Sequence, residues 1–83
     1  MSVYVDDAFI PYGRMLMSHM MADSTEELLA MATKIDLHHR WLQKAGTYKE
    51  HFDVSKSYRK DALANGAIAV STHDLLEKML AKK

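Results

Sequence analysis

The sequence predicts an α/β protein in which a small, single-layer and mostly parallel sheet of about four short strands is flanked by three helices. Short runs of β-branched and apolar residues, typical of buried strands, alternate with amphipathic stretches of helical length. Helices that alternate with strands in this way indicate parallel pairing through right-handed crossovers. The length of 83 residues suits one small domain over residues 1–83.

Four short segments are expected to be strands. Each is rich in β-branched, aromatic or other apolar residues, and turn-forming residues such as Gly13 and Gly66 lie between them. The expected strands are residues 3–5, 15–22, 40–43 and 67–70.

Three stretches carry a start signal followed by an apolar helical face. The first, residues 24–35, opens with Ser24 and Glu27 in the spacing of a capping box. Each of the others follows a side chain that can accept a hydrogen bond from the first turn. The candidate caps are Asp53 or Ser55 for the second helix, and Ser71 or Thr72 for the third.

Composition excludes several classes of protein. Eleven basic residues balance eleven acidic ones, which argues against a general nucleic-acid binder because such proteins need a surplus of positive charge. The absence of cysteine excludes disulfides, cysteine-based zinc sites and thiol catalysis. No apolar run is long enough for a transmembrane helix, and the N-terminus lacks the order of a signal peptide. We therefore expect a cytoplasmic protein without membrane contact.

One helix start gathers groups that suit an anion. Lys56, two serine hydroxyls and Arg59 surround the expected N-terminus at Ser55, directly after the segment that holds His51 and Asp53. The alternative is plain capping, since serine and aspartate at a helix start need no ligand. The residues expected to bind a ligand are His19, Trp41, Gln43, His51, Ser55 and Arg59.

Two of these residues have a competing structural interpretation. His19 lies four residues before Asp23, so one face would hold both and Asp23 could orient the imidazole. The alternative is a core histidine beside an ordinary helix cap. Trp41 is expected to be a core anchor rather than a stacking platform, although Gln43 beside it could hydrogen-bond a purine or a sugar.

Paired acids suggest a possible divalent cation. Asp6 and Asp7 close the first expected strand, and ligands of open α/β sheets bind beyond the carboxyl ends of strands. The alternative is a turn with solvated acids. The candidate metal ligands are Asp6, Asp23 and Asp53.

Several short segments, taken together in their order and spacing, span the chain from residue 3 to residue 70. They are Val3-Tyr4-Val5-Asp6-Asp7 before Pro11, His19-Met20-Met21-Ala22-Asp23, Trp41-Leu42-Gln43, His51-Phe52-Asp53, and Ser55 to Arg59 leading to Gly66-Ala67. The set resembles a family of short proteins of unknown function found in bacteria and their phages. That family usually has an aromatic residue where Leu42 stands, so the resemblance implies no stacking role at this position.

The resemblance implies a shared pattern and a phage or mobile-element context, but no activity. The residues of the shared pattern are Asp6, His19, Asp23, Trp41, Gln43, His51, Asp53 and Arg59.

Three functions are compatible with the sequence. The first is binding of a phosphorylated, nucleotide-like ligand without turnover, which could sequester a signalling nucleotide. We expect such a small core to form a homo-oligomer, with the methionines of residues 15–21 either at its surface or in the core. The second is a metal-dependent hydrolase or nuclease that uses the aspartates and histidines. The third is an adaptor or inhibitor that contacts a host protein through Phe9, Ile10 and Tyr12.

Overall fold

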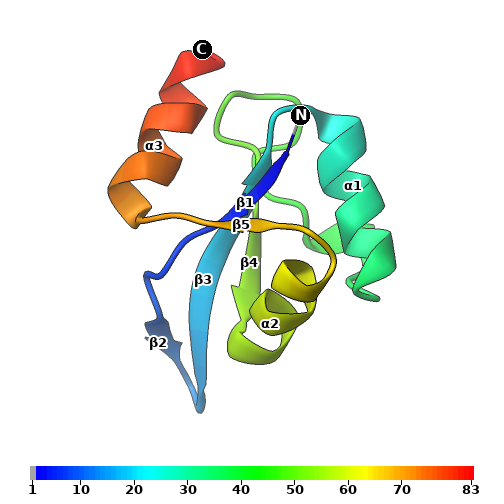
Figure 1. The fold of residues 1–83 in the computed structure, drawn as a ribbon, viewed down its shortest axis with the longest axis vertical. Helices are drawn as coiled ribbons and strands as arrows, with labels where there is room; N and C mark the ends of the chain where they lie inside the picture. The colour runs from blue at the N-terminus through cyan, green and yellow to red at the C-terminus, as the bar shows by residue number, and fades with distance from the viewer. Residues whose placement is uncertain (1) are drawn as a thin grey trace.

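The computed structural model describes residues 2–83 as one five-stranded sheet with helices on both faces (Figure 1). The strands are β1 (Val3–Val5), β2 (Ile10–Tyr12), β3 (Met15–Ala22), β4 (Phe52–Ser55) and β5 (Ile68–Ala69). The helices are α1 (Thr25–Lys34), α2 (Lys56–Ala64) and α3 (Thr72–Ala81), with a short 3-10 helix η1 (His39–Trp41).

The sheet is mostly antiparallel, so the expectation of a mostly parallel sheet of about four strands is wrong. β3 pairs antiparallel with β1, β2 and β4, and the parallel pair is β1 with β5. Only Gly13 and Arg14 separate β2 from β3, and a two-residue connection can only close an antiparallel hairpin. Gly13 supplies the left-handed conformation that this turn needs, with φ of 61°.

The connection through α1 also differs from a parallel crossover. After α1, residues 35–51 carry the chain back to the end of the sheet where β3 finished (Figure 1). β4 therefore runs antiparallel to β3. The alternation of helix and strand in the sequence predicts that β4 runs parallel to β3. The long return segment instead makes β4 antiparallel to β3.

The expected strands are confirmed at residues 3–5 and 15–22, and the strand at 67–70 is shortened to β5. The strand expected at residues 40–43 is wrong. The His38 side chain accepts a hydrogen bond from the backbone of Arg40, which stabilises the helical turn η1 instead. Gln43 then forms a single bridge with His51. β2 and β4 were not predicted as strands.

The three helices are confirmed, and serine caps each of them. Ser24 accepts from the backbone N–H of Glu27, which is the first bond of a capping box, and its hydroxyl, rather than its backbone N–H, donates to the Glu27 carboxylate. Ser55 accepts from the backbone N–H of Tyr58 at the start of α2, and Ser71 accepts from that of Asp74 at the start of α3. Asp53 is therefore free of a capping role and lies within β4.

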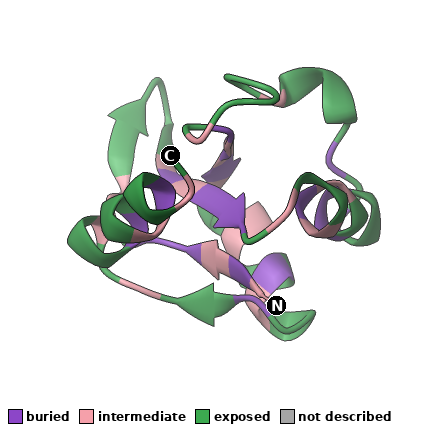
Figure 2. Cartoon of the chain, turned by 90° about the horizontal axis from the view of Figure 1, so that it is seen from above, coloured by how far each residue is buried: buried purple, intermediate pink, exposed green. Residues whose placement is uncertain are grey.

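Alternation along β3 produces two cores on opposite faces of the sheet. Met20 and Ala22 pack with Phe52 and the inner faces of α1 and α2. Met21 points the other way and packs against α3. Figure 2 shows the buried residues concentrated on the central strands between the helices. Within residues 2–83, no helix is long and apolar enough to cross a membrane.

A bulge separates β1 from β2 along the same edge of β3. Met20 pairs with Val5, whereas Met17 pairs with Ile10, so residues 6–9 face only two residues of β3. The extra length bends the chain at Phe9, which has φ of 46°. This bulge is what turns the Asp6 side chain onto β3.

Candidate functional site

A groove with a cavity volume of about 560 Å³ opens beside β3, within the size range of small-molecule sites. α3 covers Met21 but leaves the earlier residues of the same β3 face uncovered. The β2–β3 hairpin forms one wall, and the segment that contains Trp41 forms another. The lining residues are Ile10, Pro11, Tyr12, Met15, Met17, His19, Leu37, Trp41, Gln43, Asp53, Ser55 and Tyr58.

Strand pairing places the polar residues of the groove. Asp53 of β4 lies opposite His19, and Ser55 lies opposite Met17. Because side chains alternate along a strand, His51, Asp53 and Ser55 share one face. The prediction that His51 and Asp53 lie on the same face is confirmed.

His19 is held by a fully buried carboxylate, that of Asp6. Nδ1 of His19 lies 2.7 Å from Oδ2 of Asp6, which is 0% exposed. Asp6 Oδ1 also accepts from the backbone N–H of His19 at 2.8 Å, and Thr72 donates to Oδ2. The imidazole therefore has a fixed orientation, and its other nitrogen, Nε2, has no hydrogen-bond partner among residues 2–83.

The pairing of His19 with Asp23 that the sequence suggested is wrong. Four residues along a strand span about 13 Å, too far for one side chain to reach the other. Oδ2 of Asp23 instead accepts from the backbone N–H of Ser2 at 2.8 Å and from the Tyr4 hydroxyl at 3.2 Å.

His51 lies beside His19 but is not among the residues that line the groove. Its ring centre lies 5.5 Å from that of His19, in an edge-to-face arrangement. Nδ1 of His51 donates to the carbonyl of Lys49 at 2.7 Å, and Nε2 lies 3.4 Å from Oδ1 of Asp53. Gln43 donates to the other oxygen of Asp53 at 2.6 Å. Both histidines and this carboxylate thus form one polar cluster.

Trp41 is exposed rather than buried, so the expectation of a core anchor is wrong. Its side chain is 56% exposed and lines the groove, and the Arg40 guanidinium lies 4.9 Å from the centre of its ring. η1 turns position 41 away from the core, whereas a strand at this place would have allowed it inward.

Ser55 and Arg59 have different places. Ser55 lines the groove and also caps α2. The Arg59 side chain donates from Nε to the carbonyl of Asp6 at 2.8 Å, and its guanidinium lies 5.1 Å from the centre of the Phe9 ring. Arg59 thus fastens α2 to the bulge and does not line the groove.

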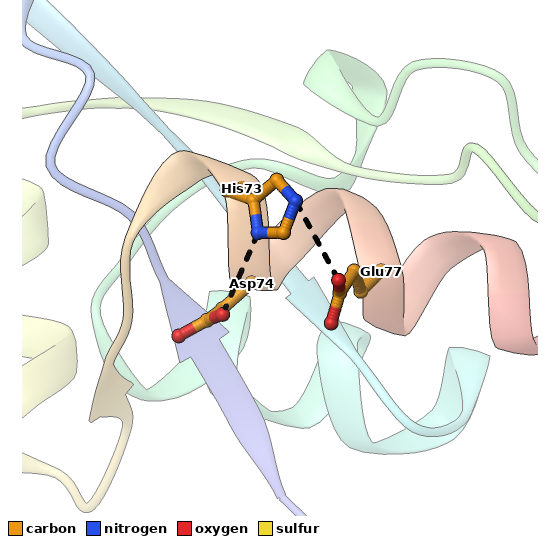
Figure 3. A group of neighbouring side chains, drawn as sticks. All are labelled: His73, Asp74 and Glu77. Atoms are coloured by element: carbon orange, nitrogen blue, oxygen red, sulfur yellow. Dashed lines mark ion pairs between the residues drawn. The ribbon is translucent and has the colours of Figure 1, made fainter.

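The three aspartates proposed as metal ligands do not form a cluster. Within residues 2–83, the group of three potential ligands close enough to share one ion is His73, Asp74 and Glu77, all exposed on α3. Figure 3 shows one nitrogen of His73 facing each carboxylate, at 3.9 and 3.5 Å. All three side chains are exposed, and at these distances the contacts are weak surface ion pairs.

Sequence reasoning missed part of the site. Tyr12, Met15, Met17 and Tyr58 line the groove but were not proposed as ligand contacts. The two-residue spacing of Met15, Met17 and His19 is the pattern that could have identified one strand face.

Sequence reasoning also missed a second buried acid. Glu50 is only 2% exposed. Its carboxylate accepts from the Thr25 hydroxyl and from the backbone N–H of Gly46. These bonds tie the segment before β4 to the start of α1.

Comparison with protein families gives a match over nearly the whole chain. Residues 3–82 match the family described as "Protein of unknown function (DUF4031)". This chain belongs to the DUF4031 family. The resemblance to a family of unknown function is thereby confirmed for DUF4031. No curated protein and no solved structure matches the chain.

Acid is expected to weaken the fold of this DUF4031 protein through Asp6. Burial raises the pKa of the Asp6 carboxyl. The hydrogen bonds from His19 and Ala8 and the charge of His19 lower this pKa by a larger amount, so the net pKa is lowered. Asp6 then stabilises the fold above its unfolded pKa of about 3.9, and this stabilisation is lost as pH falls through the lower folded value.

The measurement is a series of denaturant unfolding curves, recorded from pH 7 down to acid pH. The free energy of unfolding of the wild type should fall more steeply with acid than that of Asp6→Asn, which has no carboxyl to protonate. Parallel curves for the two proteins would contradict the assignment.

Proposed function

We propose that the groove binds a small nucleotide-like ligand that carries one phosphoryl group. The observation that carries this proposal is the side chain of Trp41, 56% exposed on the wall of a cavity that is also lined by His19 and Asp53. A large aromatic face exposed beside convergent polar groups suits a ligand with a planar part and a polar part.

The aromatic end would hold the base. Trp41 and Tyr12 both line the groove and are 56% and 71% exposed, so each has a ring face available for stacking. Gln43 lies beside Trp41 and uses its amide nitrogen on Asp53, which leaves the amide oxygen to accept from a base amine or a sugar hydroxyl.

The charge of the groove disfavours a ligand with more than one negative charge. No lysine or arginine is among its lining residues, and Asp53 contributes a carboxylate. The N-terminus of α2 opens at Ser55 on the same wall, and the helix dipole favours an anion there. A phosphodiester with a single charge therefore fits better than a dianionic monoester. In the phage or bacterial setting that the resemblance indicates, the ligand would be a signalling nucleotide.

A protein partner is the second candidate. The β2–β3 hairpin exposes Ile10, Tyr12, Met15 and Leu16 by 51%, 71%, 47% and 36%. Contact with a host protein or with another copy of the chain would cover this apolar hairpin. The groove is the stronger candidate because it adds polar groups of fixed orientation to the apolar surface.

Calorimetric titration with 3′,5′-cyclic AMP and 2′,3′-cyclic AMP tests the proposal. We expect saturable binding that Trp41→Ala weakens roughly tenfold or more, since stacking on an aromatic side chain contributes about 1–3 kcal/mol per base. Unfolding free energy should change by less than about 0.5 kcal/mol, because Trp41 is exposed.

Leu80→Ala is the matched control, since Leu80 is 57% exposed on α3 and does not line the groove. Absence of binding, or equal affinity in Trp41→Ala and Leu80→Ala, would refute the proposal.

A further inference from the structure

We infer that the groove selects a base with an exocyclic amine, because Asp53 fixes the amide of Gln43 so that the amide oxygen is left to accept from that amine. This inference rests on the proposed binding function and names the class of base. Gln43 contacts the base, and Asp53 is a positioning residue that acts on the base only through Gln43. Both residues line the groove together with Trp41.

The Gln43 backbone is fixed beside the strand β4. Its N–H donates to the carbonyl of His51 at 2.9 Å, and its carbonyl accepts from the N–H of His51 at 3.1 Å. These two bonds attach position 43 to the residue before β4, so the Gln43 side chain starts from a fixed point. Trp41 lies two residues earlier on the same segment and lines the same groove.

The Asp53 carboxylate decides which way the Gln43 amide faces. Nε2 of Gln43 lies 2.6 Å from Oδ2 of Asp53. An ionised carboxylate can only accept hydrogen bonds, so the amide nitrogen must face it and the amide oxygen is directed elsewhere. That oxygen, Oε1, has no hydrogen-bond partner among residues 2–83. Gln43 therefore offers an acceptor to a ligand in the groove.

His19 presents a second acceptor to the same groove. Nδ1 lies 2.7 Å from the buried carboxylate of Asp6, so Nδ1 carries the hydrogen of the neutral ring. The lone pair is then on Nε2, which has no hydrogen-bond partner within the described part of the chain. Two carboxylates thus turn two side chains of the groove into acceptors, and a ligand that carries donors satisfies both.

The other polar side chains of the groove are compatible with such a ligand. The hydroxyls of Tyr12, Ser55 and Tyr58 can rotate to donate or to accept. The Ser55 oxygen accepts from the backbone N–H of Tyr58, so its hydrogen can donate to a phosphoryl oxygen. The indole N–H of Trp41 only donates, but it lies at the edge of the ring, whereas a stacked base lies over the ring face.

Adenine suits these acceptors better than hypoxanthine. The adenine ring carries an amine that can donate to Oε1 of Gln43. Hypoxanthine carries a carbonyl at the same position, so two acceptors would face each other without a hydrogen between them. A site with a fixed hydrogen-bonding group discriminates against a ligand that lacks the matching group, because the group of the site is then left unpaired.

The experiment compares three nucleotides, with the fluorescence of Trp41, the one tryptophan of the sequence, as the signal. The nucleotides are 3′,5′-cyclic AMP, its 6-deamino analogue, which has hydrogen in place of the amine, and 3′,5′-cyclic IMP. We expect the wild type to bind 3′,5′-cyclic AMP about three- to tenfold more tightly than either of the others, which is the effect of one hydrogen bond. Equal affinities for 3′,5′-cyclic AMP and the 6-deamino analogue overturn the inference and leave the binding proposal intact. No saturable signal with any of the three overturns both.

Two variants test the roles of Gln43 and Asp53. Gln43→Leu removes the acceptor, so the three affinities should come within about twofold of one another. Asp53→Asn offers a donor as well as an acceptor, so the Gln43 amide can turn its nitrogen toward the ligand. The preference of this variant for 3′,5′-cyclic AMP over 3′,5′-cyclic IMP should fall to about twofold or less. A wild-type preference in either variant overturns the inference.

Asp74→Asn is the matched control for Asp53→Asn. It removes one carboxylate from an exposed side chain of α3 that does not line the groove, so it should keep the wild-type preference. Damage to the fold would lower all three affinities together, whereas the inference predicts a change in their ratio. Where a variant does not fold, the wild-type comparison of 3′,5′-cyclic AMP with the 6-deamino analogue decides alone.

Discussion

Asp6→Ala is expected to lower the free energy of unfolding by about 3 kcal/mol or more, because a buried donor left without its acceptor costs about 1–3 kcal/mol. The Asp6 carboxylate is fully buried and accepts hydrogen bonds from two backbone N–H groups, from the ring of His19 and from the hydroxyl of Thr72. Alanine leaves all four donors without this acceptor. The bonds join β1, β3 and α3, so their loss affects the whole fold.

Urea unfolding at pH 7 measures this loss. Asp7→Ala is the matched control, because Asp7 is the adjacent acid and its residue is exposed. Its unfolding free energy should change by less than about 0.5 kcal/mol. Equal effects of the two substitutions would show that Asp6 does not organise the structure.

Phe52→Ala is expected to be the most damaging change in the apolar core. Phe52 is 0% exposed and is the largest of the fully buried side chains within residues 2–83. It packs between the sheet and the helices α1 and α2. Truncation of a buried phenylalanine costs about 3–5 kcal/mol. Because small domains have only about 5–15 kcal/mol of stability, this is a large fraction of the total and the melting temperature should fall sharply.

Far-ultraviolet circular dichroism during thermal unfolding measures the Phe52 effect. Leu76→Ala is the control, since Leu76 is 51% exposed on α3. A melting temperature of Phe52→Ala equal to that of Leu76→Ala would contradict the observed packing.

Local chemistry made the helices predictable. Ser24, Ser55 and Ser71 each stand immediately before a helix and accept from its first turn. Such capping depends on residues three positions apart, which a sequence displays directly. The strand at residues 15–22 was predictable for a similar reason, because its apolar run is long.

Strand direction was harder to predict because it depends on contacts between distant residues. The antiparallel pairing of Met20 with Phe52 is decided by how the long segment after α1 returns to the sheet. Nothing in the sequence of that segment specifies the direction of return. The short strand β2 was missed because Pro11 and Gly13 indicated only a turn.

The residues of the candidate site were predicted better than the contacts between them. His19, Trp41, Gln43, Asp53 and Ser55 all line the groove. The sequence did not reveal that Asp6 orients His19, because that contact arises from a bulge between strands. It also suggested burial for Trp41, since tryptophan in a strand usually packs inward and the 3-10 turn was not foreseen.

The most direct test of ligand binding in the groove is a proton–nitrogen NMR titration with 3′,5′-cyclic AMP. The Trp41 indole N–H and the Gln43 side-chain amide both report on the groove, and Lys78 of α3 reports on a region outside it. The account predicts saturable shifts of Trp41, Gln43 and His19 while Lys78 stays unchanged. Unchanged signals of Trp41 and Gln43, or shifts confined to α3, would contradict it.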